Sequence, residues 1–297
     1  TMKVDERKIS APNVGAPRMI TPGSFMVSAF DMEGKKKWER NVGEFISAHG
    51  FNACPVLYRN LVIVNGDHDG DAYLAALDKQ TGQLQWKVPR ENKTRSYATP
   101  IIHTIGKREQ MILCGDKSVA SYDPANGKRH WIIDGPTEQF VASMVYNGKY
   151  AFVTGGYPER HILAIRPEGS GNITETHIAW RAKRGASYVP SPVVVGPYFV
   201  VVADNGIASC FNAENGTRLW MERLGGGHSA SAITANGLAY CVSDRGITSV
   251  IKPNPKFEVV AKNDLKELVS SSPAISQGQI FIRGQKHLYC IGTKSKN

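Results

Sequence analysis

Short apolar runs alternate with polar turns along almost the whole chain. One stretch, AALDKQTGQLQW from Ala75 to Trp86, shows the unit: apolar residues, an aspartate, a glycine-containing turn and a tryptophan. The residues before the aspartate alternate or run apolar, as in a strand that is half buried on a sheet. An aspartate carboxylate can accept backbone N–H groups across a bend, and glycine supplies a positive φ without a Cβ clash. The pattern therefore predicts two antiparallel strands joined by a tight turn.

This unit repeats along the chain. Further copies run from Ser121 and from Cys210, a shortened copy begins at Ala29, and a stretched copy begins at Ala164. A divergent copy, Val250 to Val260, has Val260 in the place of the tryptophan. Strand repeats of about 40 to 50 residues are typical of propeller blades. A large flat side chain at one place in each repeat suits the gap between neighbouring sheets, so we expect five docking tryptophans: Trp38, Trp86, Trp131, Trp180 and Trp220.

The turn and its tryptophan resemble the tryptophan-docking repeat of the PQQ-like (quinoprotein-like) β-propellers. Stretches that resemble the first strand of that family's blade begin at Ser96, Ser187 and Val269, and third-strand stretches begin at Asp204 and Lys286. The resemblance covers about residues 28–292. It implies an all-β fold, but the family includes enzymes, assembly proteins and sensor domains, so the fold does not fix the function.

We predict one all-β domain over residues 1–297, a seven-bladed β-propeller of four-stranded antiparallel blades; eight blades or an incomplete ring is the alternative. Blade one is clear only from Phe25 to Trp38, after an irregular segment, 1–24. Blade seven starts at Val269 and stops after its third strand. Because a closed ring avoids bare sheet edges, we expect the N-terminal segment to complete blade seven. No helix longer than two turns is expected, and Asn263–Leu268 is the best short candidate.

Composition excludes several classes of protein. The chain is 41% hydrophobic, which suits a globular protein, and its longest apolar stretch, Val193 to Ala203, is too short for a membrane helix of about 20 residues. No charged-then-apolar signal segment opens the chain. The net charge of +10 favours anionic partners, but the basic residues are scattered and no stacking motif accompanies them. We therefore expect no nucleic-acid binding.

The five cysteines include no CxxC and no adjacent pair. They lie in or beside apolar strand patterns, so we expect buried free thiols, with one disulfide between neighbouring strands as the alternative.

GDHDGD, Gly66 to Asp71, is the densest acidic cluster. Asp67, Asp69 and Asp71 alternate as in the start of a calcium loop, but glycine is not at the sixth position and Asp78 belongs to the repeat turn. We expect a hydrogen-bonded loop here and no metal site.

Stretches that lead into the innermost strands would line the mouth of a propeller's central funnel, a usual place for ligands. Their mixed aromatic, cationic and amide groups suit an anionic or polyhydroxyl ligand. These candidate ligand-binding residues are His49, Asn52, Arg95, Tyr97, Gln139, Arg184, Tyr188 and His228.

The resemblance also bears on catalysis. Quinoprotein dehydrogenases hold PQQ between a tryptophan and a disulfide of adjacent cysteines, beside a calcium ion. This chain has no adjacent cysteines, and all its tryptophans lie at docking positions, so no cofactor or catalytic residue is carried over and PQQ is not expected.

We therefore predict a non-catalytic, monomeric scaffold or recognition module that binds a protein partner. It resembles the non-enzymatic members of the family, of which an outer-membrane assembly lipoprotein is the best characterised. The resemblance implies a periplasmic or otherwise exported location. The alternatives are a dehydrogenase of quinoprotein type and a propeller that binds a small ligand in its funnel.

Overall fold

The computed structural model describes residues 7–9, 18–20, 22–47 and 49–292. These residues form β-strands joined by turns and contain no helix, so none of them builds a helix that could cross a membrane. The chain divides into two compact units. Unit 1 comprises Thr1–Phe140 and Pro167–His177, and unit 2 comprises Val141–Arg166 and Ile178–Asn297.

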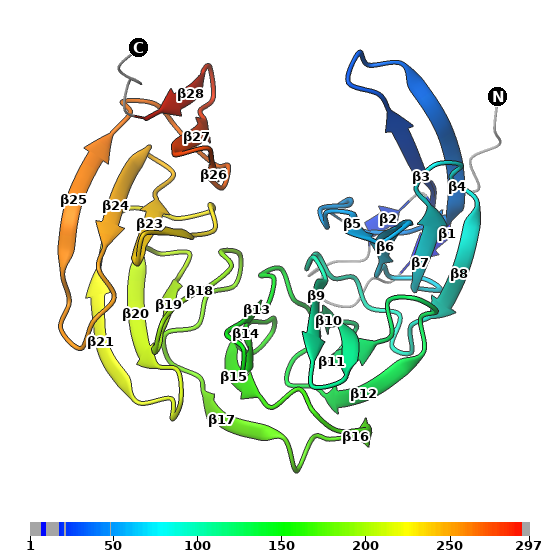
Figure 1. Ribbon diagram of the computed structural model, residues 1–297, viewed down its shortest axis with the longest axis horizontal. Coiled ribbons are helices and arrows are strands. Elements are labelled where there is room, and N and C mark those ends of the chain that lie inside the picture. The colour runs from blue at the N-terminus through cyan, green and yellow to red at the C-terminus, as the bar shows by residue number, and fades with distance from the viewer. Residues whose placement is uncertain (1–6, 10–17, 21, 48, 293–297) are drawn as a thin grey trace. The chain divides into compact units, whose positions relative to one another are not determined.

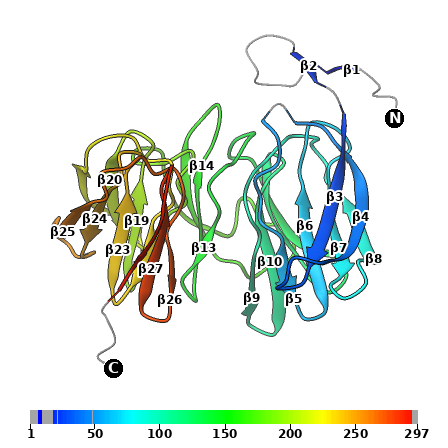
Figure 2. The same ribbon diagram turned by 90° about the horizontal axis from the view of Figure 1, so that it is seen from above.

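Unit 1 contains a short hairpin, a long hairpin and two larger sheets. Figure 2 shows the short hairpin of β1 and β2 beyond one end of β3 and β4. The strand order of each sheet is β1-β2, β3-β4, β5-β6-β7-β8 and β16-β12-β11-β10-β9, antiparallel except where β16 runs parallel to β12. The bounds are β1 Arg7–Ile9, β2 Arg18–Ile20, β3 Gly23–Phe30, β4 Lys36–Phe45, β5 Val56–Tyr58, β6 Leu61–Gly66, β7 Tyr73–Asp78, β8 Leu84–Pro89, β9 Ile101–Ile105, β10 Arg108–Gly115, β11 Ser118–Tyr122, β12 Arg129–Asp134 and β16 Gly171–Asn172.

Unit 2 contains three four-stranded antiparallel sheets and one three-stranded sheet (Figure 1). Within each sheet, neighbouring strands follow one another in the chain, except that β17 follows β15. The orders are β13-β14-β15-β17, β18-β19-β20-β21, β22-β23-β24-β25 and β26-β27-β28. The bounds are β13 Val145–Tyr146, β14 Ala151–Gly155, β15 His161–Ile165, β17 Ile178–Ala182, β18 Val193–Val195, β19 Tyr198–Val202, β20 Ile207–Asn212, β21 Arg218–Arg223, β22 Ile233–Ala235, β23 Leu238–Val242, β24 Ile247–Ile251, β25 Val259–Asp264, β26 Ala274–Ser276, β27 Gln279–Arg283 and β28 Leu288–Ile291.

The turn between β7 and β8 forms as its sequence dictates. Asp78 Oδ1 accepts the N–H groups of Gln80 and Thr81 at 2.9 and 2.8 Å, and Gly82 takes a φ of +70°. A β-bulge lies between Ala76 and Leu77. Equivalent register shifts occur in the other four-strand meanders that contain a tryptophan, and they place that tryptophan opposite a small residue each time.

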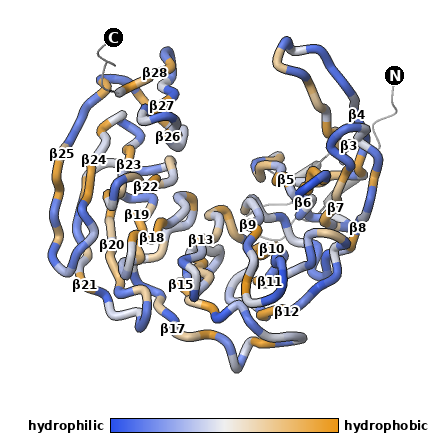
Figure 3. The backbone as a smooth tube through the Cα atoms, in the orientation of Figure 1, coloured by the Kyte–Doolittle hydropathy of each residue, from blue (hydrophilic) through white to orange (hydrophobic). Residues whose placement is uncertain are grey.

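Neighbouring sheets of each unit pack face to face. In unit 1, Phe25, Val27 and Trp38 of β3 and β4 bury themselves against the β5–β8 sheet at Val64 and Ala75. Figure 3 shows hydrophobic residues along inner strands such as β19 and β20, and mostly hydrophilic residues along the outer strand β4. The core thus lies between sheets, as expected when no sheet can cover its own apolar faces.

Serine hydroxyl groups link the stretches that lead into the innermost strands of successive sheets. In unit 2 the N–H of Ser143 donates to Ser191 Oγ, that of Ser191 to Ser231 Oγ, and that of Ser231 to Ser272 Oγ, at 2.9 to 3.0 Å. Because these short strands offer few ladder bonds, the side-chain acceptors satisfy backbone groups that would otherwise be unpaired.

Some of the predictions made from the sequence are confirmed by the structure, and others are wrong. The all-β fold with four-stranded antiparallel sheets is confirmed, and within the described residues the last sheet has three strands, as expected. The short helix at Asn263–Leu268 is wrong, because Asn263 and Asp264 pair with β24 inside β25. Val260 does not stand in for a tryptophan either: the register places Ala261 opposite Val250, and Val260 is 52% exposed.

Some predictions concern arrangements beyond the described residues. Arg7–Ile9 pairs with β2, while residues 1–6 lie outside the described residues, so the pairing of the N-terminal segment with the last sheet stays a prediction. The single domain over 1–297 also stays a prediction beside the two compact units.

All five cysteines are free, but Cys54 and Cys290 are exposed, which corrects their expected burial.

Candidate functional site

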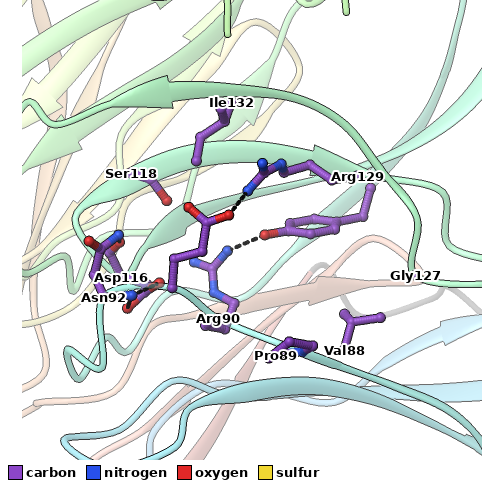
Figure 4. Close-up of a pocket in the computed structure, with 11 residues that line it drawn as sticks. Val88, Pro89, Arg90, Asn92, Asp116, Ser118, Gly127, Arg129 and Ile132 are labelled. Atoms are coloured by element: carbon purple, nitrogen blue, oxygen red, sulfur yellow. Dashed lines mark hydrogen bonds and ion pairs between the residues drawn. The ribbon is translucent and has the colours of Figure 1, made fainter. Parts of the chain in front are cut away.

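A polar cavity of about 190 Å³ lies in unit 1, where the linker after β8 meets the turn between β10 and β11 (Figure 4). Most of its lining is charged or polar, because both segments are turns that leave the apolar strands. The side chains that matter for its chemistry are Arg90, Glu91, Asn92, Asp116, Tyr122 and Arg129.

Arg90 makes the central contacts of this cavity. Its Nε donates to Asp67 Oδ1 at 2.7 Å, its Nη1 to the Tyr122 hydroxyl at 2.5 Å and its Nη2 to the Gly115 carbonyl at 3.0 Å. The side chains of Arg90 and Asp67 are 1% and 0% exposed. Burial opposes the charge on Arg90, but Asp67, Tyr122 and Asp116 together outweigh it and raise the pKa of the guanidinium. Burial also raises the pKa of Asp67, although Arg90 favours its charged form. The ion pair therefore holds the cavity together.

The other charged groups of the cavity are also paired. Arg129 forms an ion pair with Glu91, and Asp116 accepts the N–H groups of Asn92 and Thr94. Among the described residues that line this cavity, every charged side chain contacts another part of the chain.

The acidic cluster of the loop after β6 does not converge on one point. Each carboxylate has its own cation: Asp67 pairs with Arg90, Asp69 with Arg95, and Asp71 with Lys93. Within the described part of the chain, no group of three acidic, histidine or cysteine side chains could hold a metal ion.

Three of the predicted funnel residues in unit 1 come together. Arg95 Nη1 donates to Asp69 Oδ1 at 2.9 Å, and its guanidinium also interacts with the hydroxyl of Tyr97. The Tyr97 ring lies 6.5 Å from that of His49. Burial raises the pKa of Tyr97, so its hydroxyl stays protonated. Of the remaining candidates in this unit, Asn52 is exposed and Gln139 is buried, and the described contacts join neither to the cluster.

The other three candidates belong to unit 2. Tyr188 donates its backbone N–H to Asp204 Oδ2 at 2.8 Å, and His228 donates its backbone N–H to the Asp204 carbonyl at 2.9 Å. Arg184 is exposed, whereas His228 is only 3% exposed. Since the eight candidates are divided between the two units, their role as one funnel stays a prediction.

The five tryptophans occupy equivalent places on the last strand of their meanders. Their indole N–H groups reach the turn of the following sheet: Trp38 donates to Lys79, Trp131 to Pro167, Trp180 to Ala213 and Trp220 to Asn254, each at 3.0 Å to the carbonyl oxygen. The N–H of Trp86 has no partner among the described residues, although its ring lies against Gly127.

Sequence reasoning missed the roles of Arg90 and Tyr122. One signal was present: an aspartate follows the second strand in several repeats, and Asp116, Asp204 and Asp244 all accept N–H groups of the preceding linker. Asp67 stands at the same place but pairs with an arginine instead. The repeat position could be read from the sequence, while the partner 23 residues away could not.

Comparison with known proteins bears out the resemblance to PQQ-like repeat proteins. A family model described as outer membrane protein assembly factor BamB matches residues 18–147. Outer membrane protein assembly factor BamB of Bordetella pertussis is 26% identical over 219 residues, which cover 69% of this chain and 53% of that protein. The chain therefore spans about half the length of this curated relative.

Solved structures show a similar fold. BamB from Moraxella catarrhalis has a TM-score of 0.53 at 13% identity, covering 97% of this chain and 98% of its own. A europium-containing methanol dehydrogenase has a TM-score of 0.60 at 13% identity, covering 89% and 72%. One fold thus accommodates an assembly factor and an enzyme, and only the site can separate these functions.

Proposed function

We propose that this chain, as a relative of the PQQ-like repeat proteins, is a non-catalytic β-propeller that binds protein partners in the assembly of outer membrane proteins. The observation that carries the proposal is the match to the assembly factor of Bordetella pertussis over 219 residues. The chemistry of the polar cavity in unit 1 agrees, because each of its charged side chains is used to hold the chain itself.

The finer architecture belongs to the same proposal. We infer seven blades, counted as the six larger sheets and the β3–β4 hairpin, in a monomer that works in the periplasm or another exported location. The turn of the β3–β4 hairpin supports a protein-binding role, because Phe30 and Met32 are 58% and 97% exposed and large exposed apolar side chains often mark interaction sites. The partner would be a protein of the outer membrane assembly machinery.

A complementation assay tests this proposal. A bacterium that lacks its own assembly factor BamB is given this protein with an export signal, and the amount of folded outer membrane protein is measured. We expect partial restoration, reduced by Met32→Ser and unaffected by Leu84→Ser, a control at a residue that is 49% exposed on β8. No restoration by a stably exported, folded protein would refute the proposal.

The second candidate function is that of a quinoprotein dehydrogenase, which the similarity to the methanol dehydrogenase favours. Against it, all five cysteines are free and none is adjacent to another, so the disulfide that the enzyme family places over PQQ has no counterpart. Titration with PQQ and calcium separates the two: the scaffold should show no saturable change in melting temperature, whereas a dehydrogenase should be stabilised by its cofactor.

A further inference from the structure

A second cavity of about 190 Å³, with a mixed polar and apolar lining, lies in unit 2, between the linker after β21 and the turn that joins β23 to β24. It occupies the same place in its repeat as the Arg90 cavity does in unit 1. Here, however, no ion pair forms between the described residues that line the cavity. The polar lining consists of Gly225, Gly226, His228, Ser243, Arg245 and Ser249.

His228 is the unusual residue of this cavity. Its side chain is buried, with the residue only 3% exposed; the Gly226 carbonyl lies near the ring, but among the described residues neither Nδ1 nor Nε2 makes a hydrogen bond of acceptable geometry. Buried polar groups are almost always paired, and an unpaired one calls for an explanation such as a missing ligand. The equally buried His68 differs at one nitrogen, because its Nδ1 accepts the N–H groups of Ile46 and Gly70, while its Nε2 has no partner among the described residues.

The backbone that leads to His228 is built for a tight turn. Gly225 and Gly226 have φ values of +104° and +67°, and a Cβ on the facing Gly206 would lie 2.2 Å from the Gly226 carbonyl oxygen. Gly225 and Gly226 line the cavity without side chains, so a ligand there can approach the main chain closely.

The charge of the lining indicates the kind of ligand. Arg245 is the one formally charged side chain among the described residues that line the cavity, and it is exposed. The nearby Asp244 does not line the cavity, and its Oδ1 accepts the N–H of Ser229 at 2.7 Å. A guanidinium at the rim, a buried imidazole and two serine hydroxyls suit an anion that accepts several hydrogen bonds.

We propose that this cavity binds a small anionic group, a carboxylate or a tetrahedral oxyanion. Arg245 supplies the charge at the rim, because its planar fork can bind two oxygens of one anion. His228 donates one ring N–H to the anion inside the cavity. This site is separate from the proposed protein-binding hairpin in unit 1, and its test does not depend on that function.

Proton uptake should accompany binding. Burial lowers the pKa of His228. The Gly226 carbonyl and the Asp244 carboxylate act in the opposite direction, because they favour the charged imidazole. A bound anion reverses this balance, so anion binding should tighten as the pH falls.

Isothermal titration calorimetry with inorganic phosphate and with acetate tests the proposal. We expect saturable binding of one of the two, and the preferred anion tells an oxyanion site from a carboxylate site. Arg245→Ala should weaken binding about tenfold or more, because a charge-assisted hydrogen bond is lost. The matched control is Arg218→Ala, which removes an exposed arginine on β21 that does not line the cavity.

His228→Gln provides a second, independent readout, since glutamine keeps a hydrogen-bond donor but cannot take up a proton. At pH values where acetate stays ionised, acetate binding by this variant should lose its pH dependence, and titrations in buffers of different ionisation enthalpy should no longer report proton uptake. The proposal fails if neither anion binds the folded protein at millimolar concentration, or if Arg218→Ala weakens binding as much as Arg245→Ala does.

Discussion

Two ion pairs of one loop differ in burial. The side chains of Asp67 and Arg90 are 0% and 1% exposed, whereas those of Asp71 and Lys93 are 92% and 62% exposed. Breaking a buried pair leaves an uncompensated charge and costs about 3–5 kcal/mol, while an exposed pair contributes about 0–1 kcal/mol. We expect Asp67→Asn to lower the free energy of unfolding by the larger amount, and Asp71→Asn, its matched control, to change it little.

Equilibrium urea unfolding followed by far-UV circular dichroism measures both variants. Equal losses of stability in the two would show that the Asp67–Arg90 pair is not the anchor of the unit 1 cavity.

Glu267 makes an acid-sensitive contact in unit 2. Its carboxylate accepts hydrogen bonds from the Tyr289 hydroxyl at 2.6 Å and from His287 Nδ1 at 2.7 Å, which together hold its pKa at about 2, below the ordinary 4.5. A depressed carboxyl pKa stabilises the folded state above the unfolded pKa, and this contribution is lost as the pH falls through the folded pKa. The window therefore runs from about 4.5 down to about 2.

Glu267→Gln removes the charge and keeps the size of the side chain. We expect a lower melting temperature than the unaltered protein at neutral pH, with a difference that shrinks as the pH falls through that window. Glu222→Gln, at an exposed residue on β21, is the control and should show no such trend. A pH-independent difference would mean that packing, not the carboxylate charge, joins β27 and β28 to the linker.

At this scale the sequence identified the residues of the acidic loop but not their partners. Asp67, Asp69 and Asp71 were recognisable as a cluster, and the expected hydrogen-bonded loop is what forms. Their cations come from the following linker, 22 to 26 residues further along the chain. A pairing of this kind depends on how two turns pack together, and no spacing in the sequence encodes it.

The turn glycine of each repeat has two separable roles. Gly82 and Gly34 both have positive φ, +70° and +82°. A Cβ on Gly82 would lie 2.5 Å from Trp38 Cε3, whereas a Cβ on Gly34 would meet nothing within 4 Å. Gly34→Ala therefore measures backbone strain alone, about 1 kcal/mol or somewhat more.

Gly82→Ala adds a clash with the docked indole to the same strain. We expect a clearly larger loss of unfolding free energy in urea than for Gly34→Ala. Similar losses in the two variants would mean that the tryptophan ring moves aside without cost, and that the docking contact is not a tight one.

Whole elements were easier to predict than their exceptions. The strands and the aspartate–glycine turns followed from alternation and turn chemistry, which act over a few residues. The prediction of a helix at Asn263–Leu268 was wrong for two reasons. A helix of six residues is only marginally stable. In addition, Asn263 and Asp264 form antiparallel strand pairs with Thr248 and Ile247 of β24. Tertiary pairing overrode local propensity there.

For the molecule as a whole, the order of the repeats could be predicted from the sequence, because each tryptophan marks one repeat. The stretched copy that begins at Ala164 hides a finer feature: Pro167–His177 leaves its own sheet, and β16 pairs with β12 of unit 1. Only the length of the insertion was visible in the sequence. The candidate funnel could be derived from repeat positions, but the two cavities could not, since turns from two different sheets form each of them.

The reactivity of the five thiols reports whether both units are folded as described. Cys54 and Cys290 are exposed, one in each unit. Cys114, Cys210 and Cys241 are buried, and desolvation raises the pKa of each to about 12. At neutral pH these thiols are therefore inaccessible to a reagent and are not ionised to the reactive thiolate.

We expect a disulfide reagent such as DTNB to modify two thiols rapidly in the native protein and the remaining three only after denaturation. Cys54→Ser and Cys290→Ser should each remove one fast thiol, and the double variant should stay unreactive until it unfolds. A third fast thiol that persists in the double variant would show that a sheet interface is open, because the buried cysteines lie on the strands whose faces make the core. Fewer than five thiols in the denatured, unreduced protein would instead reveal a disulfide and overturn the assignment of free cysteines.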